Sequence, residues 1–341
     1  MKTNLSIWLM MCCFAITANA VAQQRITVSL KGKADYNSIQ AALNSLSDSS
    51  VTTRIIYIKN GTYNEKIYLE KHNVVLEGED RDKTIIRQSI SRDEWRCLHN
   101  EDWGVATMNV DANDITLKNL TVLNNYGFEN KKDKVIFCPS DTTGAQQRII
   151  RPNSHQMALR TMNTTRLKAI NCRFRAYAGD TVSPWNVQSG MFYFKDCIME
   201  GGVDFYCPRG WAYAEGCTFI THSGEAAIWH DGSKVQDSKT VLVNCSFEGI
   251  DNFKLGRYHR DAQFYLINCS FAANMADKDI YLVPTTNTIR WGRRVYYFNC
   301  HRKNGDYIWF ADNLSSANGN IDPRKIDAAW VFGNRWNPLI N

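Results

Sequence analysis

Two aspartates and an arginine in the 341-residue chain lie in segments whose residue types could do chemistry together. Asp180 lies in AGDTV, Asp204 in GGVDFYCPRG and Arg257 in LGRYH. Two carboxylates can supply a nucleophile and a proton donor if their surroundings push the two pKa values apart. Taken singly, each aspartate could equally be a turn residue, and Arg257 could form a structural ion pair. The choice depends on whether the fold brings the three residues together.

A repeated sequence unit predicts the fold. In each unit, alternating apolar residues are followed by Asn, Asp or Gly and then by Cys, and an earlier copy has Leu120 in place of the cysteine. The units alternate with period two and are rich in Val, Ile, Tyr and Phe, as strands are. One residue type at one point of each unit indicates stacked turns with an inward cysteine ladder, because free cysteine packs as a small hydrophobe. The ladder cysteines are Cys172, Cys197, Cys217, Cys245, Cys269 and Cys300.

These units predict an all-β fold, a single-stranded right-handed parallel β-helix in which each coil contributes about three short strands. Residues 36–43 have apolar residues at helical spacing and are expected to form an N-terminal capping helix. The final stretch, with Trp309, Trp330 and Trp336, is expected to pack along the outside. Residues 24 apart can lie on neighbouring coils about 5 Å from each other, which would place the two aspartates on one face.

The N-terminus predicts export. Lys2, an apolar run at residues 5–16 and the sequence Ala-Asn-Ala at residues 18–20 are typical of a secretory signal peptide over residues 1–20. Residues 21–341 are then expected to form one soluble β-helix domain in the periplasm or outside the cell. No later stretch has the 18 or more apolar residues of a membrane span.

Cysteine count and charge narrow the possibilities further. Eleven cysteines, less Cys12 and Cys13 in the signal segment, leave nine, an odd number that cannot all pair internally, although a few disulfides remain open. The sequence contains no CxxC pair, so the cysteines give no indication of a metal site. A net charge of +6 without a dense basic stripe argues against nucleic acid and suits a polyanionic partner.

The chain resembles the pectin methylesterases (pectinesterases) over most of residues 30–300. DYNSIQAAL at residues 35–43, GTYNEKI at 61–67 and LEGEDRDKTII at 76–86 are shared loosely with other pectin-acting β-helices and favour the fold. The later segments are more specific. GGVDFYCPRG resembles the family's segment with the nucleophilic aspartate, AGDTV the acid/base segment and LGRYH the arginine segment.

The resemblance implies an esterase that removes methyl groups from galacturonate residues of pectin, without cofactor or metal. Arg257 would hold Asp204 ionised, and Asp204 would attack the ester carbonyl. Asp180, kept protonated by its negative neighbour, would protonate the departing methoxide and then take a proton from water.

Departures from the family's pattern concern the oxyanion and the substrate. Where the family has a glutamine before its acid/base aspartate, this chain has Gly179, and a second family glutamine matches His155, with Gln156 one residue out of step. Those glutamines help to hold the oxyanion in the family, so His155 and Gln156 are the oxyanion candidates here. Tyr258 and His259 replace a proline and a tryptophan.

Aromatic and histidine residues near these segments are the expected sugar contacts. Five aromatic residues could form sugar-stacking subsites, and about half of this set is expected to face a groove while the others lie in the core: Tyr206, Trp211, Trp185, Trp229 and Tyr258. The expected substrate-binding residues are Tyr206, Trp211, Trp229, His230, Tyr258 and His259.

Two other functions remain open. Paired carboxylates also cleave glycosidic bonds, which allows a glycoside hydrolase. A non-catalytic β-helix could instead bind an acidic polysaccharide, or the chain could de-esterify one other than pectin. In each case the expected partner is a polygalacturonate-like polymer, and the expected oligomeric state is a monomer.

Overall fold

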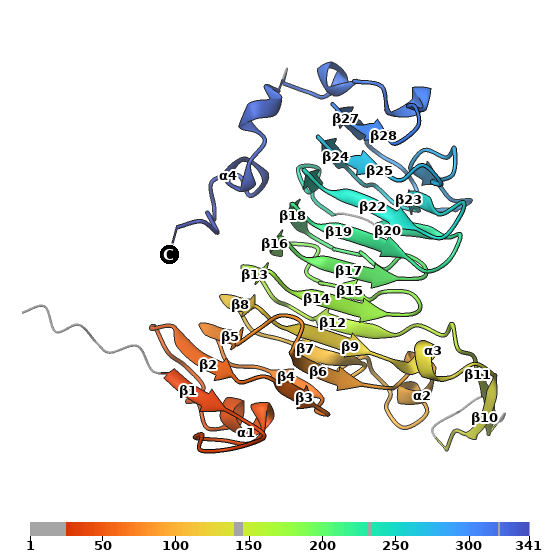
Figure 1. Ribbon diagram of the computed structural model, residues 1–341. Coiled ribbons are helices and arrows are strands. Elements are labelled where there is room, and N and C mark those ends of the chain that lie inside the picture. The colour runs from red at the N-terminus through yellow and green to blue at the C-terminus, as the bar shows by residue number, and fades with distance from the viewer. Residues whose placement is uncertain (1–24, 140–145, 231–233, 320, 341) are drawn as a thin grey trace, which may run out of the picture.

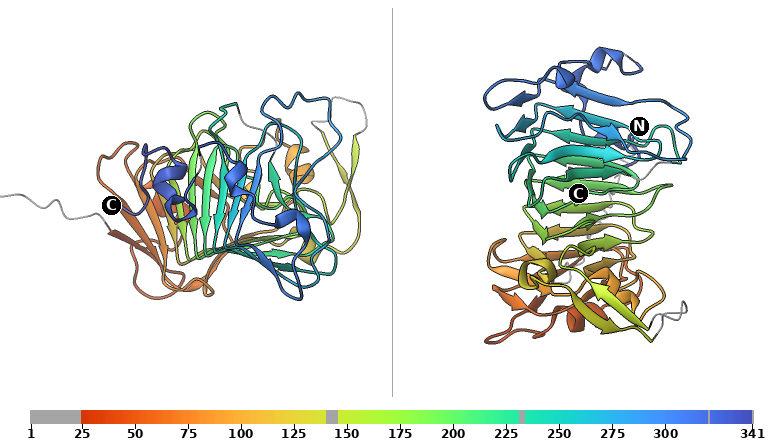
Figure 2. Two further views of the ribbon diagram at one scale, coloured as in Figure 1. Left: turned by 90° about the horizontal axis from the view of Figure 1, so that it is seen from above. Right: turned by 90° about the vertical axis from the view of Figure 1, so that its right-hand side faces the viewer.

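The computed structural model describes residues 25–139, 146–230, 234–319 and 321–340, so the expected signal peptide lies outside the described residues. Short parallel strands stack coil upon coil in sequence order along one axis (Figures 1 and 2). The strands form three sheets, here called A, B and C. The parallel β-helix expected from the repeated units is confirmed.

Sheet A contains ten strands in the order β1 (Arg25–Val28), β2 (Arg54–Ile58), β5 (Val74–Gly78), β8 (Ile115–Lys118), β13 (Leu167–Ile170), β16 (Met191–Lys195), β18 (Trp211–Glu215), β21 (Thr240–Val243), β24 (Phe264–Ile267) and β27 (Val295–Phe298). Sheet B contains nine strands, β3 (Gly61–Tyr63), β6 (Thr84–Gln88), β9 (Thr121–Asn124), β14 (Arg173–Ala176), β17 (Ile198–Gly201), β19 (Thr218–Thr221), β22 (Ser246–Gly249), β25 (Ser270–Phe271) and β28 (His301–Arg302).

Sheet C consists of two parts joined by one residue. Tyr206 forms single bridges to Val182 on one side and to Ile228 on the other. The strands of the first part are β4 (Ile67–Leu69), β7 (Ala106–Val110), β12 (Met157–Thr161) and β15 (Val182–Ser183), and those of the second are β20 (Ala226–His230), β23 (Lys254–Tyr258) and β26 (Tyr281–Leu282).

The repeated Asn-Cys pair forms the corner between sheets A and B. From β8–β9 onward, each corner has two residues, the first with a positive φ and the second buried. A positive φ is strained for most side chains and tolerated by Asn, Asp and Gly, which explains the repeated choice of residue. The first residues are Asn119, Asn171, Asp196, Gly216, Asn244, Asn268 and Asn299, with φ between 48° and 61°. The buried second residues are Leu120 and the six expected cysteines, which therefore form the inward ladder.

One disulfide joins two excursions from the coils. Cys97, just after helix α2 (Arg92–Arg96), bonds to Cys138, which follows β10 (Lys134–Phe137). Strand β10 pairs antiparallel with β11 (Gln147–Ile150). The other seven cysteines among the described residues are buried and lie outside this disulfide.

Helices close the two ends of the stack. The expected capping helix is α1 (Ile39–Asn44), which begins at Ser38, whose hydroxyl accepts from the Ala41 amide. The remaining helices are α3 (Tyr126–Glu129), α4 (Ala328–Val331) and the 3-10 turns η1 (Ile308–Phe310), η2 (Leu314–Ser316) and η3 (Pro323–Lys325). No helix in the described part of the chain is long and apolar enough to span a membrane.

The C-terminal segment packs against two different parts of the stack. Trp309 and Phe310 pack against the end of the interior core, so Trp309 does not lie along the outside as expected. The chain then turns back beside the stack (Figure 1). There Trp330, Val331 and Trp336 pack with side chains on the outer face of sheet A, as expected for this segment.

Candidate active site

A cavity of about 390 Å³ opens over sheet C. It is lined by residues of β12, β20 and β23, of the turns before β15 and Tyr206, and of the α2 excursion. The lining residues are Arg92, Asp102, His155, Met157, Arg160, Asp180, Trp185, Asp204, Arg209, Trp229 and Arg257. The three residues singled out from the sequence therefore meet in one cavity.

Asp180 and Asp204 occupy equivalent positions on neighbouring coils. Each lies two residues before a member of sheet C, and Val182 bridges Tyr206 in register. The Asp180 amide donates to the Asp204 carbonyl at 3.3 Å. Both residues have a positive φ, 64° and 49°, a strained conformation of the kind that clusters at functional sites.

Two glycines allow close packing at the Asp204 turn, Gly202 against the preceding coil and Gly201 against Phe205 of the same turn. A Cβ on Gly202 would lie 2.3 Å from the Tyr177 carbonyl oxygen, and a Cβ on Gly201 would lie 2.2 Å from Phe205 Cβ. No real side chain fits at such distances. The GG pair before Val203 and Asp204 is therefore a packing requirement of this turn.

Arg257 holds Asp204 with both arms of its guanidinium. Its Nε donates to Asp204 Oδ1 at 2.9 Å and its Nη2 to Oδ2 at 2.6 Å, the bidentate geometry of a strong ion pair. Burial nevertheless raises the pKa of Asp204 above its usual value; Arg257 acts against this rise and the charge of Asp180 adds to it. Arg257 therefore favours the ionised form of Asp204, and burial opposes it more strongly.

A second arginine accompanies Asp180. Arg209 Nη2 lies 3.7 Å from Asp180 Oδ2, and its Nη1 donates to Ser183 Oγ at 2.9 Å. Arg160 donates to the same hydroxyl at 2.8 Å, and both guanidiniums lie over the ring of Trp185. Both arginines are buried, so the cavity carries fixed positive charge beside both carboxylates.

The two oxyanion candidates lie on opposite sides of the backbone. His155 lines the cavity, and its charge lowers the pKa of Asp204. Gln156 is fully buried and does not line the cavity. Its Nε2 donates to the carbonyls of Pro152 and Ser154, and its Oε1 accepts from the Gly127 amide at 2.8 Å. The structure therefore keeps His155 as a candidate and gives Gln156 a structural place instead.

Some of the expected sugar contacts lie at the cavity and others do not. Trp229 lines the cavity, and His259 packs edge-to-face against it with ring centres 4.6 Å apart. The His230 side chain lies outside what the structure describes. Tyr206 is fully buried between Phe194 and Phe219, which corrects its expected place at the cavity.

Two further expected contacts also lie elsewhere. Trp211 is on the outer face of sheet A, under the C-terminal segment, where its Nε1 donates to Asp237. Tyr258 points into the core and packs near Phe264, because its neighbour Arg257 points outward and side chains alternate along a strand. Neither reaches the cavity.

Sequence reasoning missed the other charged residues of the cavity. Arg160 and Arg209 stand inside segments that attracted attention for different residues, QMALR and GGVDFYCPRG. Arg92 and Asp102 form a bidentate pair at 3.0 and 2.9 Å on the α2 excursion, which no repeated unit marks. An excess of arginine within the motif segments was the one available signal.

The described residues contain no group of three or more His, Cys, Asp or Glu side chains that could hold a metal ion. The cavity instead offers Asp180 and Asp204 on neighbouring coils, a third carboxylate in Asp102, an imidazole and several guanidiniums. Such a set can provide a nucleophile, a proton donor and stabilisation of a developing negative charge.

Comparison with known proteins finds similarity to pectinesterases. Residues 25–150 match the family model for pectinesterase. Probable pectinesterase 8 of Arabidopsis thaliana is 25% identical over 328 residues, which cover 91% of this chain and 76% of that protein. These matches make the chain similar to the pectinesterase family over its N-terminal third and, more distantly, over most of its length. The match to the pectinesterase model ends before His155, so every cavity residue except Arg92 and Asp102 lies beyond it.

Other pectinesterase relatives match in part, and solved structures match in fold. Probable pectinesterase/pectinesterase inhibitor 58 of Arabidopsis thaliana is 27% identical over 232 residues, 66% of this chain. The chain spans only 35% of that relative's length. Pectin methylesterase PemA from Erwinia chrysanthemi superimposes with a TM-score of 0.68 at 19% identity, over 92% of this chain and 98% of that one. A pectin methylesterase solved with a hexasaccharide gives 0.69 at 18% identity, over 93% and 98%.

Proposed function

We propose that the protein hydrolyses methyl esters of galacturonate residues in pectin. One observation carries the proposal: Arg257 binds both oxygens of Asp204 in a cavity that Asp180 lines from the neighbouring coil. Similarity to pectinesterases supports the reaction class, and the positive charge around the carboxylates suits a uronic-acid polymer.

Asp204 acts as the nucleophile. Arg257 fixes its carboxylate, which attacks the ester carbonyl carbon and leaves a negative charge on the carbonyl oxygen. His155, with a ring nitrogen protonated, donates a hydrogen bond to that oxygen. Collapse of the tetrahedral species breaks the bond to the methoxide.

Asp180 moves the protons. In its neutral form it protonates the methoxide, which leaves as methanol and gives an anhydride between Asp204 and the sugar carboxyl. The Asp180 carboxylate then accepts a proton from water as that water attacks the anhydride. Asp204 is released with a free galacturonate carboxylate. Trp185 and Trp229 line the same cavity and offer aromatic surfaces for sugar rings.

Export by the signal peptide of residues 1–20, a periplasmic or extracellular location and a monomeric state are parts of the same proposal. A polymer of plant cell walls is met outside the cell, which agrees with the sequence of the N-terminus.

The test measures methanol released from highly methylated pectin by the chain from residue 21 onward, alongside Asp204→Ala and Asp180→Ala. The expected result is release by the parent and none by either variant, with all three folded by circular dichroism. Reducing ends produced in place of methanol would instead indicate a glycoside hydrolase.

A second candidate function is pectin binding without catalysis. It is favoured by Gly179 and by the Gln156 amide, whose groups are used in structural hydrogen bonds. It predicts no methanol from the folded parent and unchanged binding of pectin by Asp204→Asn. Methanol release by the parent rejects it.

A further inference from the structure

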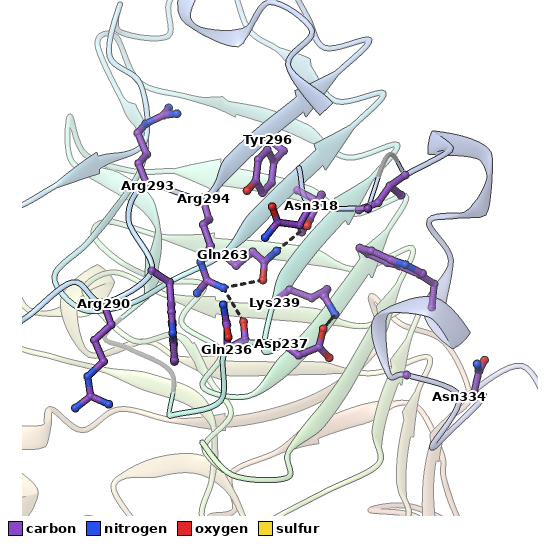
Figure 3. Close-up of a pocket in the computed structure, with 16 residues that line it drawn as sticks. Gln236, Asp237, Lys239, Gln263, Arg290, Arg293, Arg294, Tyr296, Asn318 and Asn334 are labelled. Carbon is purple, nitrogen blue, oxygen red and sulfur yellow. Dashed lines mark hydrogen bonds and ion pairs between the residues drawn. The ribbon is translucent and has the colours of Figure 1, made fainter. Parts of the chain in front are cut away.

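A second and larger cavity, of about 970 Å³, lies away from the carboxylates, between the edge of sheet A and the C-terminal segment (Figure 3). Arg290, Arg293 and Arg294 line one side of it, and Asn318 and Asn334 of the C-terminal segment lie opposite (Figure 3). None of the residues that line the active-site cavity takes part. The reaction proposed above does not use it.

The floor of this cavity is a row of polar side chains on consecutive coils. Lys239, Gln263 and Arg294 each directly precede a strand of sheet A, and these strands pair in register. Neighbouring strands lie about 4.8 Å apart, so the three side chains form a line along the axis of the stack. A repeating ligand that runs along the axis would meet one of them at each coil.

The charge of the cavity is strongly one-sided. Its lining holds four cationic side chains, Lys239, Arg290, Arg293 and Arg294, against the single carboxylate of Asp237. Asp237 pairs with Lys239 at 2.7 Å, and Asp279 pairs with Arg293. Arg290 and Arg294 have no ion pair with any residue that the structure describes.

Arg294 is a buried cation whose guanidinium is only partly hydrogen-bonded within the described part of the chain. It is 92% buried, and its Nη1 donates to the Gln236 carbonyl and to Gln263 Oε1. Its Nε and Nη2 are buried and have no hydrogen-bond partner among the residues that the structure describes. Leaving buried charged donors unpaired is costly, and burial lowers the pKa of this guanidinium.

Nε and Nη2 form one edge of the guanidinium, the edge with which Arg257 holds both oxygens of Asp204. On Arg294 the same edge is not bound to a carboxylate of any residue that the structure describes. The ring of Trp291 lies over the guanidinium, 4.9 Å from its Cζ. Because neither nitrogen is open to solvent, a carboxylate reaches them only if side chains of the cavity rearrange.

We infer that this cavity is a second binding site for a carboxylate-bearing saccharide, a stretch of free uronic acid residues held by Arg290 and Arg294. Trp291 supplies an aromatic surface for the sugar ring, and Asn318 supplies an amide for its hydroxyls. The choice of saccharide rests on the proposed function, since de-esterification leaves free uronate carboxylates on the polymer. The site would retain the modified part of the chain while the active site works on another part.

Calorimetric titration with unesterified tetragalacturonate tests the site, using the chain from residue 21 onward. Arg290→Gln changes an exposed side chain and Arg294→Met a buried one, so the first remains informative if the second fails to fold. Arg324→Gln is the matched control, because Arg324 is an exposed arginine of the C-terminal segment outside the cavity. Each lost charged contact is expected to weaken this binding about tenfold or more.

The expected result is tetragalacturonate binding that persists in Asp204→Ala, weakens in Arg290→Gln and Arg294→Met, and is unchanged in Arg324→Gln. A neutral tetrasaccharide should not compete. The fluorescence change on binding should disappear in Trp291→Phe. The KM for polymeric pectin should rise in Arg290→Gln, while kcat stays unchanged.

Binding that is unaffected by Arg290→Gln and Arg294→Met, or displaced equally well by acetate, overturns the inference. Failure of the proposed esterase activity has a different signature. In that case the parent releases no methanol, yet the two arginine variants still lose tetragalacturonate binding.

Discussion

The imidazole of His155 fills the space that a side chain on residue 179 would need. A Cβ on Gly179 would lie 3.2 Å from both Cδ2 and Nε2 of His155. The two departures from the family's glutamine pattern are therefore one structural change. Loss of the side chain at Gly179 makes room for the ring at His155, which lines the cavity beside Asp204.

Replacing His155 tests its place at the oxyanion. His155→Ala should lower kcat by roughly 10²–10³, the usual effect of losing one oxyanion donor, with little change in KM. His155→Gln retains a donor and should recover part of the loss. Equal activity in the parent and both variants, measured by methanol release, would remove His155 from the mechanism.

Gly179→Ala tests the same relationship from the other side. The added methyl group would push the imidazole by a few tenths of an ångström, so kcat should fall while the melting temperature changes little. The control is Gly224→Ala, where the nearest atom to the new Cβ is 3.8 Å away. A fall in activity of the same size in Gly224→Ala would contradict the explanation.

The pH dependence of the reaction follows from Asp204. The ionised form attacks, and burial raises the pKa of this carboxyl above 3.8, so kcat/KM should rise with pH through an apparent pKa above that value. Arg257 lowers the pKa of Asp204, so Arg257→Gln should move the rise to still higher pH besides reducing the rate. A pH–rate profile of both proteins checks this. A shift toward acid in Arg257→Gln is the opposite of what the geometry requires.

Gly202→Ala should damage both stability and activity. Its Cβ would meet the Tyr177 carbonyl at 2.3 Å, which is backbone and cannot move aside easily. We expect a loss of about 1–3 kcal/mol in the free energy of unfolding, together with a displaced Asp204 and a lower kcat. Urea denaturation and methanol release measure the two effects. A variant with parental stability would show that the turn adapts freely.

The corner residues can be tested at Asn244, which is exposed and has φ of 54°. Asn244→Ala should lower the free energy of unfolding by roughly 1–2 kcal/mol, because a Cβ without a polar side chain is strained in this conformation. Asn244→Gly keeps the conformation accessible and should cost clearly less. If the alanine and glycine variants were equally stable in urea, positive φ would not explain the repeated asparagine.

The sequence predicted the fold well because each coil repeats its own local rules. Alternation identified the strands, and the Asn-Cys pair marked the corner. The 24-residue interval also predicted that Asp180 and Asp204 would meet, since neighbouring coils bring such positions together. Local pattern and global fold agree at these positions.

The side chains around the cavity were harder to predict because side chains alternate between inward and outward along each strand. A shift of one residue therefore reverses the direction of a side chain. His155 and Arg257 point outward into the cavity. Gln156 and Tyr258, the residues that directly follow them, therefore point inward. Trp211 lies on a different sheet, beneath a C-terminal segment whose course no repeat predicts. Arg92 comes from an excursion between coils, where sequence spacing carries no information about distance.

The two-residue corner between sheets A and B also limits how the gene can change. One residue added there would turn every inward side chain of the next strand toward solvent. Length has instead varied elsewhere: successive ladder cysteines lie 25, 20, 28, 24 and 31 residues apart, while the strand–corner–strand unit stays constant. Insertions, grafted peptides and whole duplicated coils should therefore be accepted at the other corners of each coil. The loops that border both cavities come from those corners, so new specificity can evolve there without disturbing the core.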